Sequence, residues 1–154
     1  MDSFFLVVTG EPVAQGRPKF STVGGHPRAV DPAKSREYKQ IVSVMARQKM
    51  ERDGRPLMEG PLRLFVDVYR VPPKSMGKRK GGNAAALHLG IQTKPDLDNY
   101  IKLVSDALNG VVFADDSQIC QIIASKRYSD KPGIVIEVID DMAYDPRDSK
   151  GDKE

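Results

Sequence analysis

Residues 62–70 alternate between apolar and mostly polar side chains, and this pattern restricts the backbone conformation that they can adopt. Successive side chains of a β-strand point to opposite faces, so alternation with a period of two is typical of a strand with one face in a core. The apolar face consists of Leu62, Leu64, Val66 and Val68. We therefore predict a half-buried strand here, and with it a β-sheet that is covered on one side.

Two other segments carry apolar residues at helical spacing. The first begins at Asp31-Pro32, where an N-cap residue precedes a proline suited to the first helical position, and ends before Gly54. The second begins near residue 97 and ends at Asn109-Gly110. The apolar positions are Tyr38, Ile41 and Met45 in the first segment, and Leu97, Ile101, Val104 and Leu108 in the second. The pattern predicts two main helices.

Three further strands are expected, at residues 3–9, 118–128 and 134–139. We predict that the last two form a hairpin joined by residues 129–133, and that the Gly- and Pro-rich residues 10–25 form a loop or an irregular strand. Residues 72–95 form a long basic connection, in which residues 84–87 could support a short helix. The element order predicts a mixed α+β (α/β) fold, with a small mixed β-sheet packed against two main helices.

A chain of 154 residues is large enough for one core, and we predict a single domain over residues 1–140. The acidic segment 141–154 is expected to be a flexible tail. No apolar run approaches the length needed to cross a bilayer, so no membrane association is expected. The single cysteine excludes an internal disulfide and is consistent with a cytoplasmic protein.

Positive charge is concentrated in the part of the chain before the tail. Residues 140–154 hold six acids against three bases, so residues 1–139 carry a net charge of +6. Between residues 70 and 102, seven basic residues accompany only two acids. Such a cluster attracts a polyanion at long range, although a charge run can also be an ordinary solvated surface.

The acids in this basic region are Asp96 and Asp98, which lie where an extended segment turns into the second helix. If the chain stays extended through Asp98, both carboxylates point the same way. Lys102 follows one helical turn later, and the strand beginning near Asp115-Asp116 can lie beside this segment and add a third carboxylate. Carboxylates without histidine or cysteine partners suit Mg²⁺ or Mn²⁺. The pattern therefore indicates a metal-dependent nuclease.

A purely structural interpretation accounts for the same residues one by one. Asp96 or Asp98 can cap the helix, and Lys102 can pair with Asp98 or Asp106 at a spacing of four residues. Asp115-Asp116 can belong to an ordinary turn before a strand. Helix caps do not require three acids, a lysine and a basic loop together, and the joint pattern therefore favours the nuclease.

This region contains three distinctive blocks, Lys94-Pro95-Asp96-Leu97-Asp98-Asn99 through Lys102, then Asp106-Ala107-Leu108-Asn109-Gly110, then Asp115-Asp116-Ser117-Gln118-Ile119. Together they closely resemble the RusA-type Holliday junction resolvase family. A looser similarity reaches the N-terminal loop, at Gly10-Glu11-Pro12 and Gly16-Arg17-Pro18. Members are small homodimers of mixed α/β fold, often encoded by prophages, that cut opposing strands of a four-way DNA junction with Mg²⁺ or Mn²⁺.

The resemblance implies that Asp96, Asp98 and Asp116 are the catalytic, metal-binding carboxylates and that Lys102 is the catalytic lysine. Asp115 neighbours these residues and is a candidate second ligand. The implied activity is paired, symmetric incision of a four-way junction by a homodimer in DNA recombination and repair. The residues expected to contact DNA are Arg17, Lys19, Lys74, Lys78, Arg79, Lys80 and Lys94.

Three other interpretations stay open. The protein could be a nuclease that prefers flaps or replication forks, or a DNA-binding protein that does not cut. The Asp96-x-Asp98 pair also resembles the acidic pair of nucleotide-sugar transferases, but the chain is short for such an enzyme and lacks an evident nucleotide site.

Overall fold

The alternating segment forms strand β4 (Leu62–Arg70) in the computed structural model, which describes residues 2–78 and 86–141. β4 lies inside a four-stranded sheet whose order is β1-β6-β4-β5. All four predicted apolar side chains of β4 are fully buried. The half-buried strand is therefore confirmed, and β4 forms the centre of the fold.

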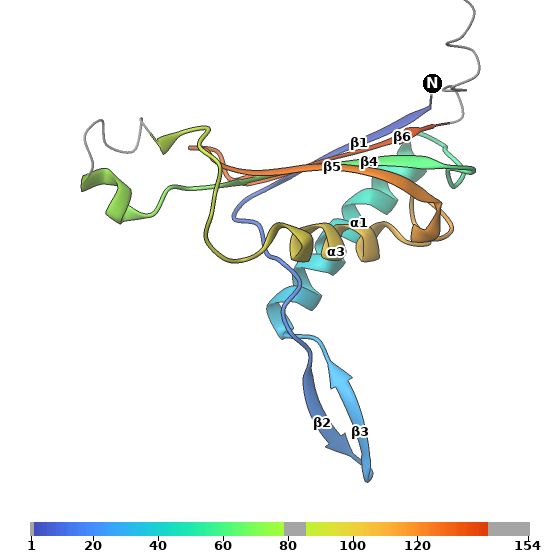
Figure 1. The fold of residues 1–154 in the computed structure, drawn as a ribbon. Coiled ribbons are helices and arrows are strands. Elements are labelled where there is room, and N and C mark those ends of the chain that lie inside the picture. Colours follow the sequence, from blue (N-terminus) through green and yellow to red (C-terminus); the bar gives the residue numbers. More distant parts are fainter. Residues whose placement is uncertain (1, 79–85, 142–154) are drawn as a thin grey trace, which may run out of the picture.

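The remaining elements make this an α+β fold of one domain, as predicted, with both main helices on the same face of the four-stranded sheet (Figure 1). The other strands are β1 (Ser3–Thr9), β5 (Ile119–Tyr128) and β6 (Gly133–Asp140), with a separate pair β2 (Lys19–Val23) and β3 (His26–Val30). The helices are α1 (Ala33–Arg52) and α3 (Leu97–Leu108), with short 3₁₀ turns η1 (Lys74–Lys78) and η2 (Asp116–Gln118).

The predicted hairpin of the last two strands is wrong, because β4 lies between them. β5 runs parallel to β4, and β6 runs antiparallel to β4 on its other edge. Four residues, 129–132, connect β5 to β6. They need to span only the roughly 10 Å across one intervening strand. Alternation identifies a strand but not its neighbours, so the sequence pattern could not reveal this order.

α1 begins at Ala33, one residue later than predicted, with Pro32 rather than Asp31 at the N-cap position, and a different stripe of its surface is buried. Tyr38 is buried as expected, whereas Ile41 is half-exposed and Met45 is only partly buried. The buried stripe continues instead through Val42, Ala46 and Met50. Steps of three and of four residues both fit a period of 3.6, so the two apolar stripes of this helix could not be ranked from the sequence.

α3 packs against the sheet and against α1, and its apolar face agrees with the predicted one. Val104 and Leu108 are fully buried, while Leu97 and Ile101 are partly buried against the same core. α3 lies on the crossover from β4 to its parallel neighbour β5, the usual place for a helix between parallel strands.

The Gly-rich N-terminal segment, expected to be a loop or an irregular strand, contains a two-stranded antiparallel ribbon. β2 and β3 are joined by Gly24 and Gly25, whose φ angles are both positive. Two consecutive residues with positive φ suit a two-residue hairpin turn, and glycine adopts this conformation without steric cost. The ribbon projects away from the rest of the molecule (Figure 1).

Two sequence predictions fall outside the part of the chain that the structure describes. These are the short helix at residues 84–87, of which only residues 86 and 87 are described, and the acidic tail after residue 141. No helix among the described residues is both long and apolar enough to cross a membrane.

Candidate active site

Asp96 and Asp98 lie at the N-terminal end of α3, although not in the conformation predicted for them. The extended backbone ends at Asp96, which occupies the N-cap position, and Asp98 belongs to the first helical turn. The argument that an extended chain points both carboxylates the same way therefore does not apply. The first amide groups of a helix lack partners within it and, with the helix dipole, favour a phosphate at this end.

Neither carboxylate has the structural role that could have explained it. The Asp96 side chain accepts no capping hydrogen bond from α3, and its Oδ2 lies 3.8 Å from Nζ of the exposed Lys94. Among the described residues, no hydrogen bond or ion pair engages the side chain of Asp98 or Lys102. Asp106 pairs with Lys39 of α1, at 3.7 Å, rather than with Lys102. The carboxylates at this end of α3 are therefore available for a ligand.

The backbone that leads into α3 is fixed to the ends of two strands. Lys126 of β5 donates from Nζ to the carbonyl oxygens of Thr93 and Pro95, at 2.8 and 2.9 Å. Arg70 of β4 donates to the carbonyl of Lys94 at 3.3 Å. These contacts hold the segment before Asp96 in place. Sequence reasoning missed Lys126, because a lysine at the end of a strand has no signature of its own.

Two buried tyrosines lie near the N-terminal end of α3, Tyr100 in its first turn and Tyr38 on the neighbouring α1. Burial raises the pKa of Tyr38 to about 12, and the neighbouring Tyr100 and Glu11 add to the shift. Burial also raises the pKa of Tyr100, an effect that the nearby Arg70 guanidinium partly offsets. Both phenols are therefore neutral at pH 7. Within the described chain, the Tyr38 hydroxyl has no hydrogen-bond partner.

A shallow cavity of about 280 Å³ opens beside Asp96. The cavity brings together one carboxylate and the two cationic residues Arg17 and Lys94, and a phosphate with its counter-ion requires charges of both signs. Its lining comes from the segment before β2 and from the start of α3: Ala14, Gln15, Gly16, Arg17, Lys94, Pro95, Asp96 and Asn99.

The second acidic pair forms the turn before β5. The Ser117 hydroxyl donates to Oδ2 of Asp115 at 2.8 Å, and this bond is the main reason why the pKa of Asp115 is lowered. Gln118 accepts hydrogen bonds from the backbone amides of Ala114 and Asp115, and donates to the carbonyls of Met58 and Gly60. Asp115 therefore takes part in a turn, and both Asp115 and Asp116 are exposed to solvent.

The two acidic pairs lie at opposite ends of α3. This helix has 12 residues and is therefore roughly 18 Å long. β5 begins beside Leu62, next to Asp116, and only its far end, at Lys126, meets the segment before Asp96. The expectation that the strand beginning near Asp115 lies beside residues 94–98 is thus wrong within one chain. No three His, Cys, Asp or Glu side chains of the described residues cluster to hold a metal ion.

Comparison with known proteins shows to which family this chain is related. The family model described as endodeoxyribonuclease RusA matches residues 9–139. The chain belongs to the RusA family. The resemblance carried by the three sequence blocks is thereby confirmed, and DNA is the expected binding partner of a chain in an endodeoxyribonuclease family.

A relative of this RusA-family chain is found in Bacillus subtilis (strain 168). It is 42% identical over 140 residues, which span 90% of this chain and 96% of the relative. Its name, "Uncharacterized protein YqaN", assigns it no activity.

The cationic residues predicted to contact DNA are spread over this RusA-family structure. Arg17 and Lys94 line the cavity beside Asp96, and Lys19 begins the projecting ribbon. Lys74 is exposed at the start of η1, and Lys78 ends it. Arg79 and Lys80 lie outside the described residues.

The oxygen donors at the start of α3 fit a hard divalent cation. Mg²⁺ is commonly held by one or two carboxylates, with water and substrate phosphate oxygens completing its shell. Asp96 and Asp98 supply carboxylates without structural partners inside α3, beside a cavity suited to a phosphate. These two carboxylates therefore have the chemistry that Mg²⁺ or Mn²⁺ requires, the third predicted carboxylate lies elsewhere in the chain, and the metal site stays a prediction.

Proposed function

We propose that this protein is a metal-dependent endodeoxyribonuclease that resolves four-way DNA junctions by paired symmetric cuts. The observation that carries the proposal is the pair of carboxylates Asp96 and Asp98 at the N-terminus of α3, of which Asp96 does not cap the helix, in a chain of the RusA family. A helix N-terminus, two acids and two cations together suit a scissile phosphate bound with a divalent cation.

In this proposal Asp96 and Asp98 hold the metal ion. A bound Mg²⁺ or Mn²⁺ would neutralise charge on the phosphate and lower the pKa of a bound water. Lys102 follows Asp98 by one helical turn on the same side of α3. Its ammonium group donates to the charge that develops on the phosphate oxygens or on the leaving oxygen. The helix amides orient the phosphate, and Arg17 and Lys94 hold the backbone on either side.

Asp116 belongs to the same site through a second copy of the chain. The separation along α3 prevents Asp116 from reaching the Asp96 of its own chain. A two-fold dimer presents every contact twice, so it forms two identical sites if Asp116 of one copy meets Asp96 and Asp98 of the other. Asp115 is the lesser candidate ligand in this arrangement, because its carboxylate already accepts a hydrogen bond in the turn.

The outer edge of β5 supports such a dimer. β5 is an edge strand, and among the described residues only the segment around Gly90 pairs with that edge, at its Arg127 end. An open edge is a template for another strand. Antiparallel pairing of two β5 edges would bring the start of one strand, next to Asp116, toward the far end of the other, where Lys126 holds the segment before Asp96.

A two-fold dimer also matches the substrate. A four-way junction has approximate two-fold symmetry, so two identical sites face opposing strands. Paired symmetric cuts would leave two nicked duplexes that a ligase can seal. Phosphate contacts carry no sequence information, so charge placement and DNA shape provide the selectivity for a branch.

The test is cleavage of a labelled immobile junction in Mg²⁺ and in chelator, beside linear duplex, flap and fork substrates. Paired, metal-dependent cuts confined to the junction are expected. Preferential cutting of flaps or forks would replace junction resolution with that specificity. Tight junction binding with no cutting in any divalent metal would overturn the nuclease and favour a binding protein.

A further inference from the structure

Among the residues that the structure describes, none packs against the β2–β3 ribbon in a way that explains its length. It forms a two-stranded sheet of its own and extends beyond both helices (Figure 1). Every side chain described between Arg17 and Val30 is exposed to solvent, and Phe20 is 80% exposed. A projecting ribbon without a core does not stabilise the domain that carries it. Its sequence therefore needs another explanation.

The pairing register divides the ribbon into two unlike faces. Directly opposed residues of an antiparallel pair share a face, and successive residues alternate. Lys19 opposes Val30, and Ser21 opposes Arg28, so both cations of the strands lie on one face. Phe20 opposes Ala29, and Thr22 opposes Pro27, on the other face. One face is therefore cationic and the other is mostly apolar, with Phe20 as its largest side chain.

The charge of the ribbon has one sign only. Residues 12–30 contain Arg17, Lys19 and Arg28 and no aspartate or glutamate. This composition favours a polyanion as the partner of the cationic face. A two-stranded ribbon also has the width that the DNA major groove admits.

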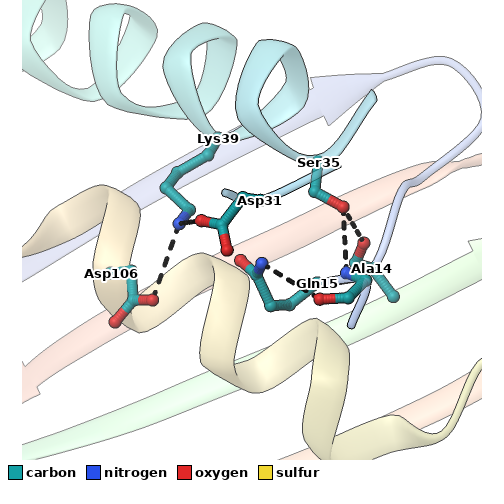
Figure 2. Close-up of polar contacts among 7 residues, drawn as sticks. Ala14, Gln15, Asp31, Ser35, Lys39 and Asp106 are labelled. Atoms are coloured by element: carbon teal, nitrogen blue, oxygen red, sulfur yellow. Dashed lines mark hydrogen bonds and ion pairs between the residues drawn. The ribbon is translucent and has the colours of Figure 1, made fainter. Parts of the chain in front are cut away.

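Buried hydrogen bonds fix the start of the ribbon on α1. The Gly16 amide donates to Oγ of Ser35 at 2.9 Å, and that hydroxyl donates to the carbonyl of Ala14 at 3.0 Å (Figure 2). Ser35 is 3% exposed, so these bonds are shielded from water. A Cβ atom at Gly16 would lie 2.7 Å from Pro32 Cγ, so only glycine permits this close approach.

An ion-pair cluster fixes the other end of the ribbon. Asp31, which follows β3, lies 3.2 Å from Nζ of Lys39, and the same ammonium lies 3.7 Å from Asp106 of α3 (Figure 2). The ribbon is thus attached at both ends to α1 and, through Lys39, to the helix that carries Asp96 and Asp98. Its direction is fixed relative to the candidate active site.

The ribbon also begins at that site. Gly16 and Arg17 line the same cavity as Lys94 and Asp96. The backbone amide of Gln15 donates to the carbonyl of Asn99, in the first turn of α3, at 3.0 Å. DNA with a phosphate at Asp96 would therefore run past the root of the ribbon.

We propose that the β2–β3 ribbon recognises the branch of the DNA substrate, with its cationic face on the phosphates and Phe20, on the opposite face, stacked on a base that is unstacked from its neighbour at the branch point. This inference rests on the proposed function, because it assumes branched DNA at the Asp96 end of α3. Bases at a branch are easier to unstack than those within a duplex, and an aromatic ring stacks on any base. Phe20 thereby supplies preference for a branch without reading a sequence.

The test measures equilibrium binding of a fluorescent four-way junction and of linear duplex, in chelator to prevent cutting. Phe20→Ala should weaken junction binding by roughly tenfold and leave duplex binding unchanged, since stacking is lost only at the branch. A 2-aminopurine placed at the branch should lose its change in fluorescence on binding. Phe5→Ala, which removes a half-exposed ring from the main sheet, is the matched control and should change neither affinity.

The cationic face makes a separate prediction. The double variant Lys19→Ala/Arg28→Ala should weaken junction and duplex binding alike and lower the salt dependence of both by about two ions. Arg47→Ala/Arg52→Ala, an equal loss of charge on the exposed surface of α1, is the control. All the altered side chains are exposed, so unchanged thermal unfolding should show that each variant is folded.

The outcomes distinguish a failure of the inference about the ribbon from a failure of the proposed function. A wild-type protein that prefers and cuts junctions, with Phe20→Ala unaffected, would overturn the inference about the ribbon alone. A wild-type protein with no junction preference would overturn both. A Phe20→Ala variant that sediments as a monomer, with its junction preference intact, would show that a second copy covers Phe20, and would also overturn the inference.

Discussion

The two ends of α3 carry the same kind of side chain in unlike surroundings. At the N-terminal end, the side chains of Asp96 and Asp98 form no hydrogen bond with the helix, and the backbone before them is fixed by Lys126 and Arg70. At the other end, Asp115 accepts a hydrogen bond that stabilises a turn. A fixed backbone that carries carboxylates without structural partners is expected of a ligand site, whereas a carboxylate inside a turn has a structural role already.

Asp116 differs from the adjacent Asp115 in that it is not the acceptor of the hydrogen bond from Ser117, and both residues are exposed to solvent. One chain therefore holds two incomplete sets of ligands roughly 18 Å apart, separated by the length of α3. Either only one set is functional or two copies of the chain combine them. Substitutions at the two ends of α3 distinguish these cases.

Asp96→Asn, Asp98→Asn and Asp116→Asn should each lower junction cleavage by on the order of 1,000-fold or more, because each removes a proposed metal ligand. Junction binding in chelator should stay close to that of the wild type. Single-turnover cleavage and binding of the same labelled junction measure both quantities. Glu51→Gln, the same change of a carboxylate to an amide on the exposed surface of α1, is the control. Equal losses of binding and cleavage would contradict a metal-centred role.

Lys126→Met should lower cleavage by about tenfold and the free energy of unfolding by about 1–2 kcal/mol. The ammonium group donates two charge-assisted hydrogen bonds to the backbone before Asp96, and small displacements of reacting groups are costly. Lys126 acts here as a positioning residue, so Lys126→Arg should recover most of the rate. Rate measurements at saturating junction, beside urea unfolding, separate the two effects. An unchanged cleavage rate in Lys126→Met would show that Lys126 does not position the active site.

Asp115→Asn should lower cleavage only a few-fold, in contrast to its neighbour Asp116. Its amide retains an oxygen for the hydrogen bond from Ser117, so the turn should persist. Metal titration of the cleavage rate measures whether the apparent affinity for Mg²⁺ changes. A loss as large as that of Asp116→Asn would make Asp115 a ligand of equal importance.

Tyr38→Phe should change the response of stability to alkali and leave the rate at pH 7 unchanged. Burial raises the pKa of Tyr38 from 10.0 to about 12, so the folded protein keeps the phenol neutral where the unfolded chain ionises. The stabilisation is complete below pH 10 and is lost as the pH rises from 10 toward 12, by about 1–2 kcal/mol. Urea unfolding at pH 8 and at pH 11 measures this loss, which should shrink in Tyr38→Phe. An identical loss in both proteins would contradict the assignment.

Local patterns predicted much of the fold. Alternation located β4, and apolar spacing with caps placed α1 and α3 within a few residues of their observed ends. The strand order was not predictable, because β5 and β6 are separated in the sheet by β4 (Leu62–Arg70), which lies far from both of them in the chain. The ribbon was missed for another reason, since all of its described side chains are exposed and no buried face gives it an alternating pattern.

The residues of the candidate site also divide into those that the local sequence predicts and those that tertiary structure places. Asp96, Asp98 and Lys102 are close in sequence, so their grouping at one end of a helix followed from the chain itself. The position of Asp116 depends on where β5 joins the sheet, and the contacts of Lys126 depend on the far end of that strand. Both are consequences of tertiary structure, which local residue patterns do not specify.

Mixed dimers of two inactive variants test most directly whether each active site is shared between two copies of the chain. Asp98→Asn and Asp116→Asn chains with different tags are co-expressed, and dimers that contain one of each are purified. If each site combines Asp98 of one copy with Asp116 of the other, a mixed dimer has one intact site and one doubly defective site. Mixed dimers are then expected to nick one strand of the junction at about half the wild-type rate. Mixed dimers as inactive as either parent would contradict a shared site, because every site within a single chain would then carry one defect.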